Sequence, residues 1–181
     1  MPSRTLGQIT AAQTAGRPLL IVLAGSNGAG KSTFHAEALS GTGIPLVNAD
    51  EVARDRVSFV METVLSDTQG AKLAFFAEAQ AAGYFLLFIH IRVDNVETSI
   101  ARVSQRVLNG GHDVPDEKLR SRFPRTQRNV ARALAMADAG LVFDNSDPGA
   151  PFRLVETWNS GRCVLSECLG VADARYAAVD T

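Results

Sequence analysis

The chain has 181 residues, of which 46% are hydrophobic and 20% are charged, and its formal net charge is −1. Such a chain is long enough to bury a core of its own, and these proportions exclude a fibrous, disordered or disulfide-rich protein. The near-neutral charge makes nucleic acid an unlikely partner for the surface as a whole. Apolar runs of at most about eight residues are too short to span a bilayer, and residues 1–8 lack a signal-peptide core. We therefore expect one domain over 1–181, cytoplasmic and without a membrane segment.

Apolar runs alternate with segments of helical spacing along the whole chain. Residues 19–24 (LLIVLA) are typical of a strand buried on both faces of a parallel sheet. The strongest strand pattern is 84–91, and Gly83 before it has the position of a left-handed helix cap. The other expected elements are strands at 44–47, 57–60 and 140–143, a hairpin over 152–164 with its turn at Ser160 and Gly161, helices at 31–39, 66–82 and 96–108, a helix opened by Pro115, and a terminal helix from Ser166. This alternation predicts an α/β domain with a mostly parallel sheet of five to six strands.

A glycine-rich motif lies between the first strand and the first helix. Residues 25–32 (GSNGAGKS) match the phosphate-binding pattern G-x-x-x-x-G-K-[ST]. We expect Lys31 to be exposed and to reach the β and γ phosphates of ATP or GTP, and the Ser32 hydroxyl to bind Mg²⁺. The predicted nucleotide-binding residues are Gly25, Ser26, Asn27, Gly28, Ala29, Gly30, Lys31, Ser32 and Thr33. A strand-to-helix turn without a ligand is the plainer alternative, but both flanking elements that the motif requires are present.

Carboxylates follow the next two predicted strands. Asp50 ends the run VNAD, and Glu62 follows the strand at 57–60, with Thr63 beside it. The carboxyl ends of parallel strands face the ligand crevice, so Asp50 and Glu62 are expected on one rim, together with Thr63 as substrate-binding residues. One carboxylate would accept a proton from an attacking hydroxyl while the other orients the substrate or a metal-bound water. The alternatives are a helix N-cap for Asp50 and an exposed strand-end charge for Glu62.

Five arginines fall on or near the helix that follows Pro115: Arg120, Arg122, Arg125, Arg128 and Arg132. On a helix, Arg125, Arg128 and Arg132 would form one stripe, with Arg122 beside it and Arg120 on the far side. Guanidinium groups suit the charge that develops in phosphoryl transfer, so residues 111–132 are a candidate helical lid. A solvated basic face is the alternative. Pro124 is expected to start or kink a helix, and His112 to have a loop or cap role rather than a metal.

Taken in order, the segments AGSNGAGKST, VNADE, FVMETVLS, GGHDVP, RSRFPRTQRN and VFDNS resemble the zeta-toxin-like P-loop kinases and NTPases. The resemblance spans 19–146 and implies a three-layer P-loop kinase fold with a helical lid. It also implies that Lys31 and Ser32 hold nucleotide and Mg²⁺, that Asp50 is the catalytic base and that Glu62 lies on the substrate side. By the same resemblance Arg122 and Arg125 are catalytic lid arginines. Better-studied members of this family phosphorylate UDP-N-acetylglucosamine and pair with a small antitoxin protein, whereas the shorter members that this chain most resembles often have no assigned substrate.

The sequence thus predicts a Mg²⁺-dependent kinase that phosphorylates a hydroxyl of an unknown small-molecule acceptor, with a UDP-sugar as one candidate. A regulatory or degenerate NTPase is the alternative. Residues 1–17 and 150–181 are expected as terminal extensions. Residues 51–56 would cover only about 9 Å as a helix but about 20 Å extended, so a helical crossover between the second and third strands is excluded. We therefore expect an open acceptor side and weak phosphorylation of UDP-N-acetylglucosamine.

Overall fold

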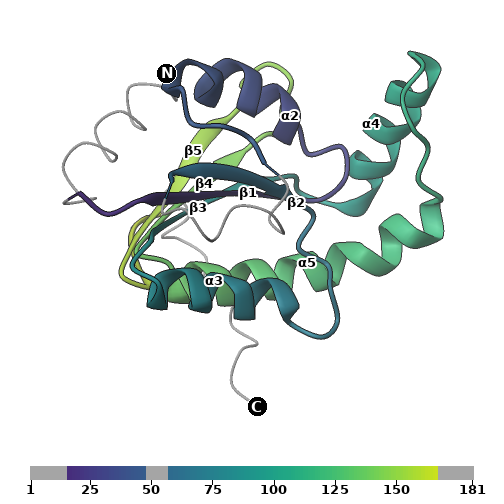
Figure 1. The fold of residues 1–181 in the computed structure, drawn as a ribbon. Helices are drawn as coiled ribbons and strands as arrows, with labels where there is room; N and C mark the ends of the chain where they lie inside the picture. The colour runs from purple at the N-terminus through teal and green to yellow at the C-terminus, as the bar shows by residue number, and fades with distance from the viewer. Residues whose placement is uncertain (1–15, 48–56, 167–181) are drawn as a thin grey trace.

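A computed structural model describes residues 16–47 and 57–166 (Figure 1). A single sheet lies between helices on its two faces. The elements are β1 (Leu19–Ala24), α2 (Lys31–Phe34) continued by a π turn (His35–Leu39) and a 3₁₀ turn (Ser40–Thr42), β2 (Phe59–Thr63), α3 (Ala71–Ala81), β3 (Phe85–Arg92), α4 (Val96–Leu108), α5 (Asp116–Met136), β4 (Ala139–Asp144), β5 (Arg153–Asn159) and β6 (Arg162–Ser166). None of the helices in these ranges combines the length and apolar character that crossing a bilayer requires.

The six strands have the order β2-β1-β3-β4-β5-β6. The first four are parallel, and β5 and β6 add an antiparallel hairpin to one edge. The hairpin turns at Ser160 and Gly161, both with positive φ, as the sequence predicts. Part of the expected C-terminal extension therefore belongs to the main sheet. The α/β prediction of a mostly parallel sheet with five to six strands is confirmed.

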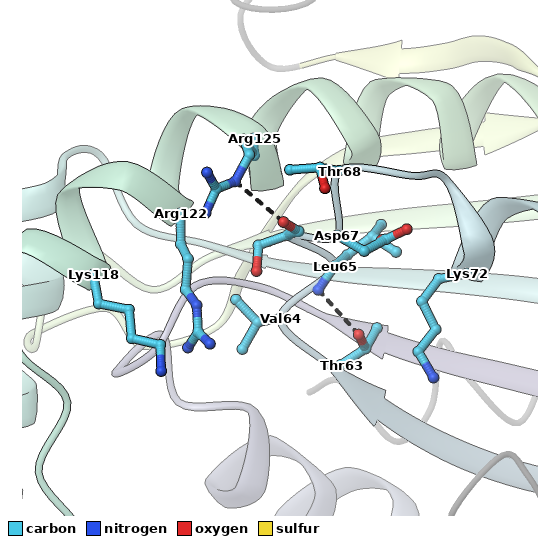
Figure 2. A pocket seen from close by; sticks show the side chains of 10 residues that line it. Thr63, Val64, Leu65, Asp67, Thr68, Lys72, Lys118, Arg122 and Arg125 are labelled. Carbon is cyan, nitrogen blue, oxygen red and sulfur yellow. Dashed lines mark hydrogen bonds between the residues drawn. The ribbon is translucent and has the colours of Figure 1, made fainter.

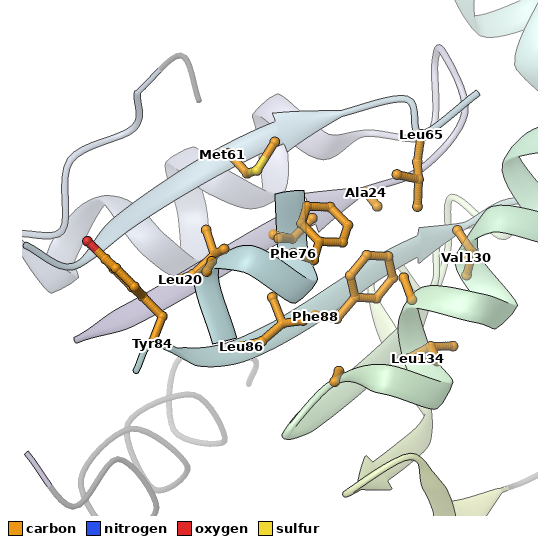
Figure 3. Packing of buried hydrophobic residues seen from close by; sticks show 14 of the residues in the cluster. Leu20, Ala24, Met61, Leu65, Phe76, Tyr84, Leu86, Phe88, Val130 and Leu134 are labelled. Atoms are coloured by element: carbon orange, nitrogen blue, oxygen red, sulfur yellow. The ribbon is translucent and has the colours of Figure 1, made fainter. Parts of the chain in front are cut away.

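Two apolar layers hold the sheet between its helices. One strand face packs on α3 and α5 through residues such as Phe76, Phe88 and Leu134 (Figure 3). Alternate residues of the same strands, including Ile21 and Ile89, face α2. All six side chains of β1 and all eight of β3 are buried, because helices cover both faces of these central strands. Their carboxyl ends are thereby fixed as the rigid base of the loops that follow.

Several expected boundaries need correction. The strand expected at 44–47 is, within the described part of the chain, an isolated parallel bridge between Leu46 and Val60. The strand expected at 57–60 is β2, so Glu62 lies inside a strand rather than after it. The helix expected from 66 begins only at Ala71, because Gly70 has a left-handed φ of 74° and ends a preceding loop.

The arginine-rich helix also differs from the expectation. α5 begins at Asp116, with Pro115 as its N-cap and Asp116 and Glu117 in its first turn, as the sequence predicts. Pro124 lies inside this helix and does not start it. The terminal helix expected from Ser166 does not begin there, because Ser166 ends β6. Residues 167–181 and Asp50 lie outside the described residues.

Candidate functional site

The loop between β1 and α2 approaches neighbouring atoms so closely that a side chain on either of two of its glycines would force those atoms to shift. A Cβ atom on Gly25 would lie 2.4 Å from the Ile91 carbonyl oxygen. At Gly30 it would lie 2.5 Å from the Asn145 Nδ2 atom, and the φ of 99° there is one that side chains rarely adopt. The glycines of the motif therefore allow the loop to fold tightly over the ends of β3 and β4.

Polar contacts from α4 and from the segment after β4 hold this loop in place. The buried hydroxyls of Ser26 and Ser99 lie 2.8 Å apart. Asn145 Nδ2 donates to the Ala29 carbonyl oxygen at 2.8 Å, and Arg102 donates to the Asn145 carbonyl oxygen at 2.6 Å. Buried polar groups that are satisfied in this way fix a loop conformation before any ligand binds.

Lys31 is buried, with only 7% of the residue accessible, although the sequence led us to expect it to be exposed. Its Nζ atom turns back and donates to the carbonyl oxygens of Gly25 at 3.0 Å and Ser26 at 3.1 Å. Burial lowers the pKa of Lys31 to about 8, an effect that the Glu62 carboxylate opposes and the Arg106 guanidinium reinforces. The ammonium group therefore loses its proton at a pH only slightly above neutrality.

Glu62 faces the start of α2 from the neighbouring strand β2. Ser32 Oγ lies 3.2 Å from Glu62 Oε2, and Lys31 Nζ lies 3.8 Å from Glu62 Oε1. Parallel pairing of β1 with β2 places Glu62 beside the glycine loop, while Asp50, expected on the same rim, lies outside the described residues.

A cavity of about 370 Å³ opens over this loop. It is lined by Asn27, Gly28, Gly30, Lys31, Ser32, Thr33, Glu62, Val64, Arg102 and Arg106. The other three predicted loop residues, Gly25, Ser26 and Ala29, are buried beneath it. We call this space the loop cavity.

Sequence reasoning missed Arg102 and Arg106, which bring two positive charges from α4 to the loop cavity. Arg106 donates to the His112 carbonyl oxygen at 2.7 Å, so the turn between α4 and α5 holds its side chain. A Cβ atom on Gly111 would lie 2.6 Å from Arg106 Cγ, which shows how closely the turn packs on this arginine. The spacing of four residues on a helix was the available signal, because it places both side chains on one face.

A second cavity, of about 500 Å³, lies beside the loop cavity between the 63–68 segment and α5 (Figure 2). It is lined by Thr63, Val64, Leu65, Ser66, Asp67, Thr68, Lys72, Lys118, Arg122 and Arg125. Val64 lines both spaces, so the two cavities adjoin at this residue. We call the second space the basic cavity. Arg122 and Arg125, expected as catalytic lid arginines, line the basic cavity rather than the loop cavity.

The remaining arginines of the expected stripe do not act together. Arg120 forms an ion pair with Glu97 on α4. Arg128 lines a third, mainly apolar cavity with Phe123 and Pro124, and Arg132 is exposed. Helical spacing alone could not show this division, because it is set by which parts of the 63–68 segment and of β3 pack against α5. Arg125, for example, donates through Nε to the Ser66 carbonyl oxygen at 3.2 Å.

The parallel sheet, the glycine loop between β1 and α2, and the cavity over that loop define a P-loop kinase-like fold. Residues 47–148, more than half of the chain, match the family model described as zeta toxin. The chain therefore belongs to the zeta toxin family, which confirms the resemblance noted in its sequence. A search of curated proteins found no match.

Solved structures of related fold come from two systems. The AvrRxo1-ORF1:AvrRxo1-ORF2 structure with sulphate ions is 16% identical, with a TM-score of 0.61, and the match covers 93% of this chain and 67% of that chain. The structure described with ATP is 17% identical, with a TM-score of 0.60, and 90% and 63% are covered. A structure of the PezAT chromosomal toxin–antitoxin system of Streptococcus pneumoniae is 14% identical, with a TM-score of 0.50, and 96% and 82% are covered. At these identities the likeness concerns the fold.

Proposed function

We propose that this chain is a phosphotransferase that moves the γ-phosphoryl group of ATP or GTP to a hydroxyl group of a small molecule. The observation that carries the proposal is the junction of two cavities at Val64, one built on the glycine loop and one on the arginines of α5. A kinase needs two adjoining sites of this kind, because donor phosphate and acceptor hydroxyl must meet in line. The ATP named with the AvrRxo1 structure and membership in the zeta toxin family support the same assignment.

The nucleotide would bind in the loop cavity. Backbone N–H groups of the loop and the start of α2 would face the phosphates, with Lys31 on the β and γ oxygens. To reach them, Lys31 Nζ must exchange its contacts with the Gly25 and Ser26 carbonyl oxygens for contacts with phosphate. Arg102 and Arg106 would add positive charge at the same phosphates from the side of α4.

The oxygen groups beside Lys31 fit a magnesium ion. The Ser32 hydroxyl and the Glu62 carboxylate lie within 3.4 Å of each other, and both are hard oxygen donors of the type that Mg²⁺ prefers. In the part of the chain that the structure describes, no group of three or more His, Cys, Asp or Glu residues could hold a metal. Mg²⁺ commonly binds through one or two protein groups together with substrate phosphates and waters. When bound, it would neutralise charge that develops on the transferred phosphoryl group.

The acceptor would bind in the basic cavity, next to Thr63 and Glu62. Its hydroxyl oxygen would bond to the γ-phosphorus as the bond from that phosphorus to the β–γ bridging oxygen breaks, releasing the nucleoside diphosphate. Asp50, which lies outside the described residues, is proposed as the group that takes the hydroxyl proton because it matches the family's catalytic base.

Acceptor-dependent release of ADP or GDP tests the proposal. The full chain would be incubated with labelled ATP or GTP and a metabolite extract, and new phosphorylated products would be identified by mass spectrometry. Lys31→Ala should abolish nucleotide binding or turnover while the domain stays folded, because the ammonium acts by charge on the phosphates. Asp50→Asn should keep nucleotide affinity within a few-fold and lower transfer by roughly 10² or more. Slow hydrolysis that no acceptor accelerates would instead identify an NTPase.

An antitoxin partner is proposed from the same relatives, since PezAT is described as a toxin–antitoxin system. If the chain is a toxin, its expression should slow growth, and the Lys31→Ala variant at equal abundance should not. Equal growth with both proteins would remove the reason to expect an antitoxin.

A further inference from the structure

The basic cavity carries more positive charge than the chain's near-neutral total would suggest. Its lining has four cationic side chains, Lys72, Lys118, Arg122 and Arg125, against the single carboxylate of Asp67. Two of the three lysines in the sequence are among them. Lys118 and Arg122 project side by side from α5, and Lys72 lies in the first turn of α3 on the other side of the 63–64 segment (Figure 2). Like charges gathered in a hollow repel each other unless an anion binds between them.

Asp67 supplies a second, independent observation. Both of its carboxylate oxygens are buried, and neither accepts a hydrogen bond from the described residues. A buried acceptor without a partner is costly, and the cost is removed when a ligand donates to it. Asn129 Nδ2 donates to the Asp67 carbonyl oxygen at 3.0 Å and so fixes the backbone that carries this carboxylate. Both oxygens are closed to solvent in this structure, so hydroxyl groups of a ligand would reach them when the Asp67 side chain turns toward the cavity that this residue lines.

The cavity lining also bears on what else the ligand contains. None of its ten residues is aromatic, and Val64 and Leu65 are its only large apolar side chains. Nucleobases are held by stacking on aromatic side chains or in apolar pockets, and this lining offers neither. Four cations and one anion match the charge of about −2 on a phosphomonoester better than the −1 of a carboxylate.

We propose that the basic cavity binds a phosphorylated sugar or polyol without a nucleobase, its phosphate held by Lys72, Lys118 and Arg122 and its hydroxyls by Asp67. As the acceptor of the reaction, this ligand rests on the proposed phosphotransferase function. Binding of this ligand in the basic cavity does not depend on phosphoryl transfer. The proposal places Arg122 at the acceptor instead of at the nucleotide.

The test measures binding by calorimetry in the full chain carrying Lys31→Ala, so that failure of phosphoryl transfer does not affect the outcome. The probes are inorganic phosphate and glucose 6-phosphate. Arg122→Ala should weaken binding of both by about tenfold, the effect of losing one charge-assisted contact. Arg132→Ala is the matched control: it removes the same charge from the same helix, is exposed, and lines none of the cavities described above. Equal weakening by the two changes, or no binding of either probe, would overturn the proposal.

Asp67→Asn tests the hydroxyl contacts separately. Removal of the negative charge should leave inorganic phosphate bound at least as tightly, while the preference for glucose 6-phosphate over inorganic phosphate should fall several-fold, since an amide replaces the carboxylate acceptor. If Arg122→Ala does not fold, Lys118→Ala replaces it, because this side chain is exposed. Tighter binding of UDP-N-acetylglucosamine than of glucose 6-phosphate, lost on Lys118→Ala, would overturn the ligand class.

Discussion

The Ser32 hydroxyl of the glycine loop donates to the Glu62 carboxylate of β2, with Oγ 3.2 Å from Oε2. The same carboxylate lies 3.8 Å from Lys31 Nζ. Glu62 therefore contacts both side chains that the motif assigns to nucleotide and metal. A triphosphate that enters the loop cavity must share these groups with Glu62, so the protonation of Lys31 and the charge of Glu62 together control binding.

Nucleotide affinity should fall as the pH rises above about 8, where the buried Lys31 ammonium loses its proton. Bound phosphate favours the charged form, so binding takes up a proton above this pKa, and affinity should fall by roughly tenfold between pH 7 and 9. Calorimetry over this range, in buffers of different ionisation enthalpy, measures both the affinity and the proton uptake. A flat affinity from pH 7 to 9 would contradict the assignment of Lys31 to the phosphates.

The free energy of unfolding should change with pH in the opposite direction, and over a higher pH range. The pKa of Lys31 is lowered from 10.5 to about 8 by burial, so the unfolded chain binds more protons between these values. This residue's contribution to the free energy of unfolding therefore rises with pH through that window. In denaturant titrations, the free energy of unfolding of the wild type minus that of Lys31→Met should rise from pH 8 to pH 10. A constant value of this difference would argue against the lowered pKa.

Glu62→Gln should move the pH dependence of nucleotide binding to lower pH. The Glu62 carboxylate raises the pKa of Lys31 against the larger effect of burial, so its removal lowers that pKa further. The midpoint of affinity against pH is the measurement. Glu97→Gln is the control, because Glu97 is an exposed carboxylate of α4 that pairs with Arg120. An unchanged midpoint in the Glu62 variant would show that the 3.8 Å contact has no electrostatic effect.

Much of this fold could be predicted from the apolar runs, the helical spacing and the turn residues of the sequence. The buried runs that became β1 and β3, the helix over 96–108 and the hairpin turn at Ser160 are all local features that the sequence states directly. The start of α3 was predicted several residues too early, since the polar residues 66–70 (SDTQG) were included in the helix although they carry no apolar spacing of their own. The backbone there follows the contacts of Thr126 and Asn129 with the carbonyl oxygens of Val64 and Leu65 instead. Such contacts between distant segments leave no periodic signal in the sequence.

The candidate site likewise has residues that the sequence predicts and residues that it does not. The glycine loop and Glu62 were predictable because a motif and parallel strand ends determine their positions. The roles of the arginines were not, since Arg102 and Arg106 reach the loop cavity only because α4 packs against Gly28 at Ser99. A Cβ on Gly28 would meet the Ser99 carbonyl oxygen at 2.9 Å. Lys31 was predicted to be exposed because a charged side chain usually is, and its contacts with loop carbonyl oxygens could not be read from composition.

Asn145→Ala should loosen the glycine loop. It removes the donor to the Ala29 carbonyl oxygen and leaves that buried oxygen without its side-chain partner, at a cost of about 1–3 kcal/mol in the free energy of unfolding. Nucleotide affinity should fall along with stability, because the loop must then be ordered by the ligand. Asn109→Ala, at the exposed end of α4, is the control. Lower stability with unchanged nucleotide affinity would limit Asn145 to a structural role.

UDP-N-acetylglucosamine should be phosphorylated weakly or not at all, although nucleotide binds normally. The lining of the basic cavity has no aromatic side chain to stack a uracil ring. The measurement is ADP release with increasing UDP-N-acetylglucosamine, with mass spectrometry of the product, beside sugar phosphates at equal concentration. Arg122→Ala should lower transfer to any sugar phosphate that works by about tenfold at subsaturating concentration and leave nucleotide affinity unchanged, because Arg122 lines the basic cavity and not the loop cavity. Saturable and efficient phosphorylation of the sugar nucleotide would show that the chain accepts a uridine group without an aromatic platform, and would return the acceptor to the class that the family resemblance implies.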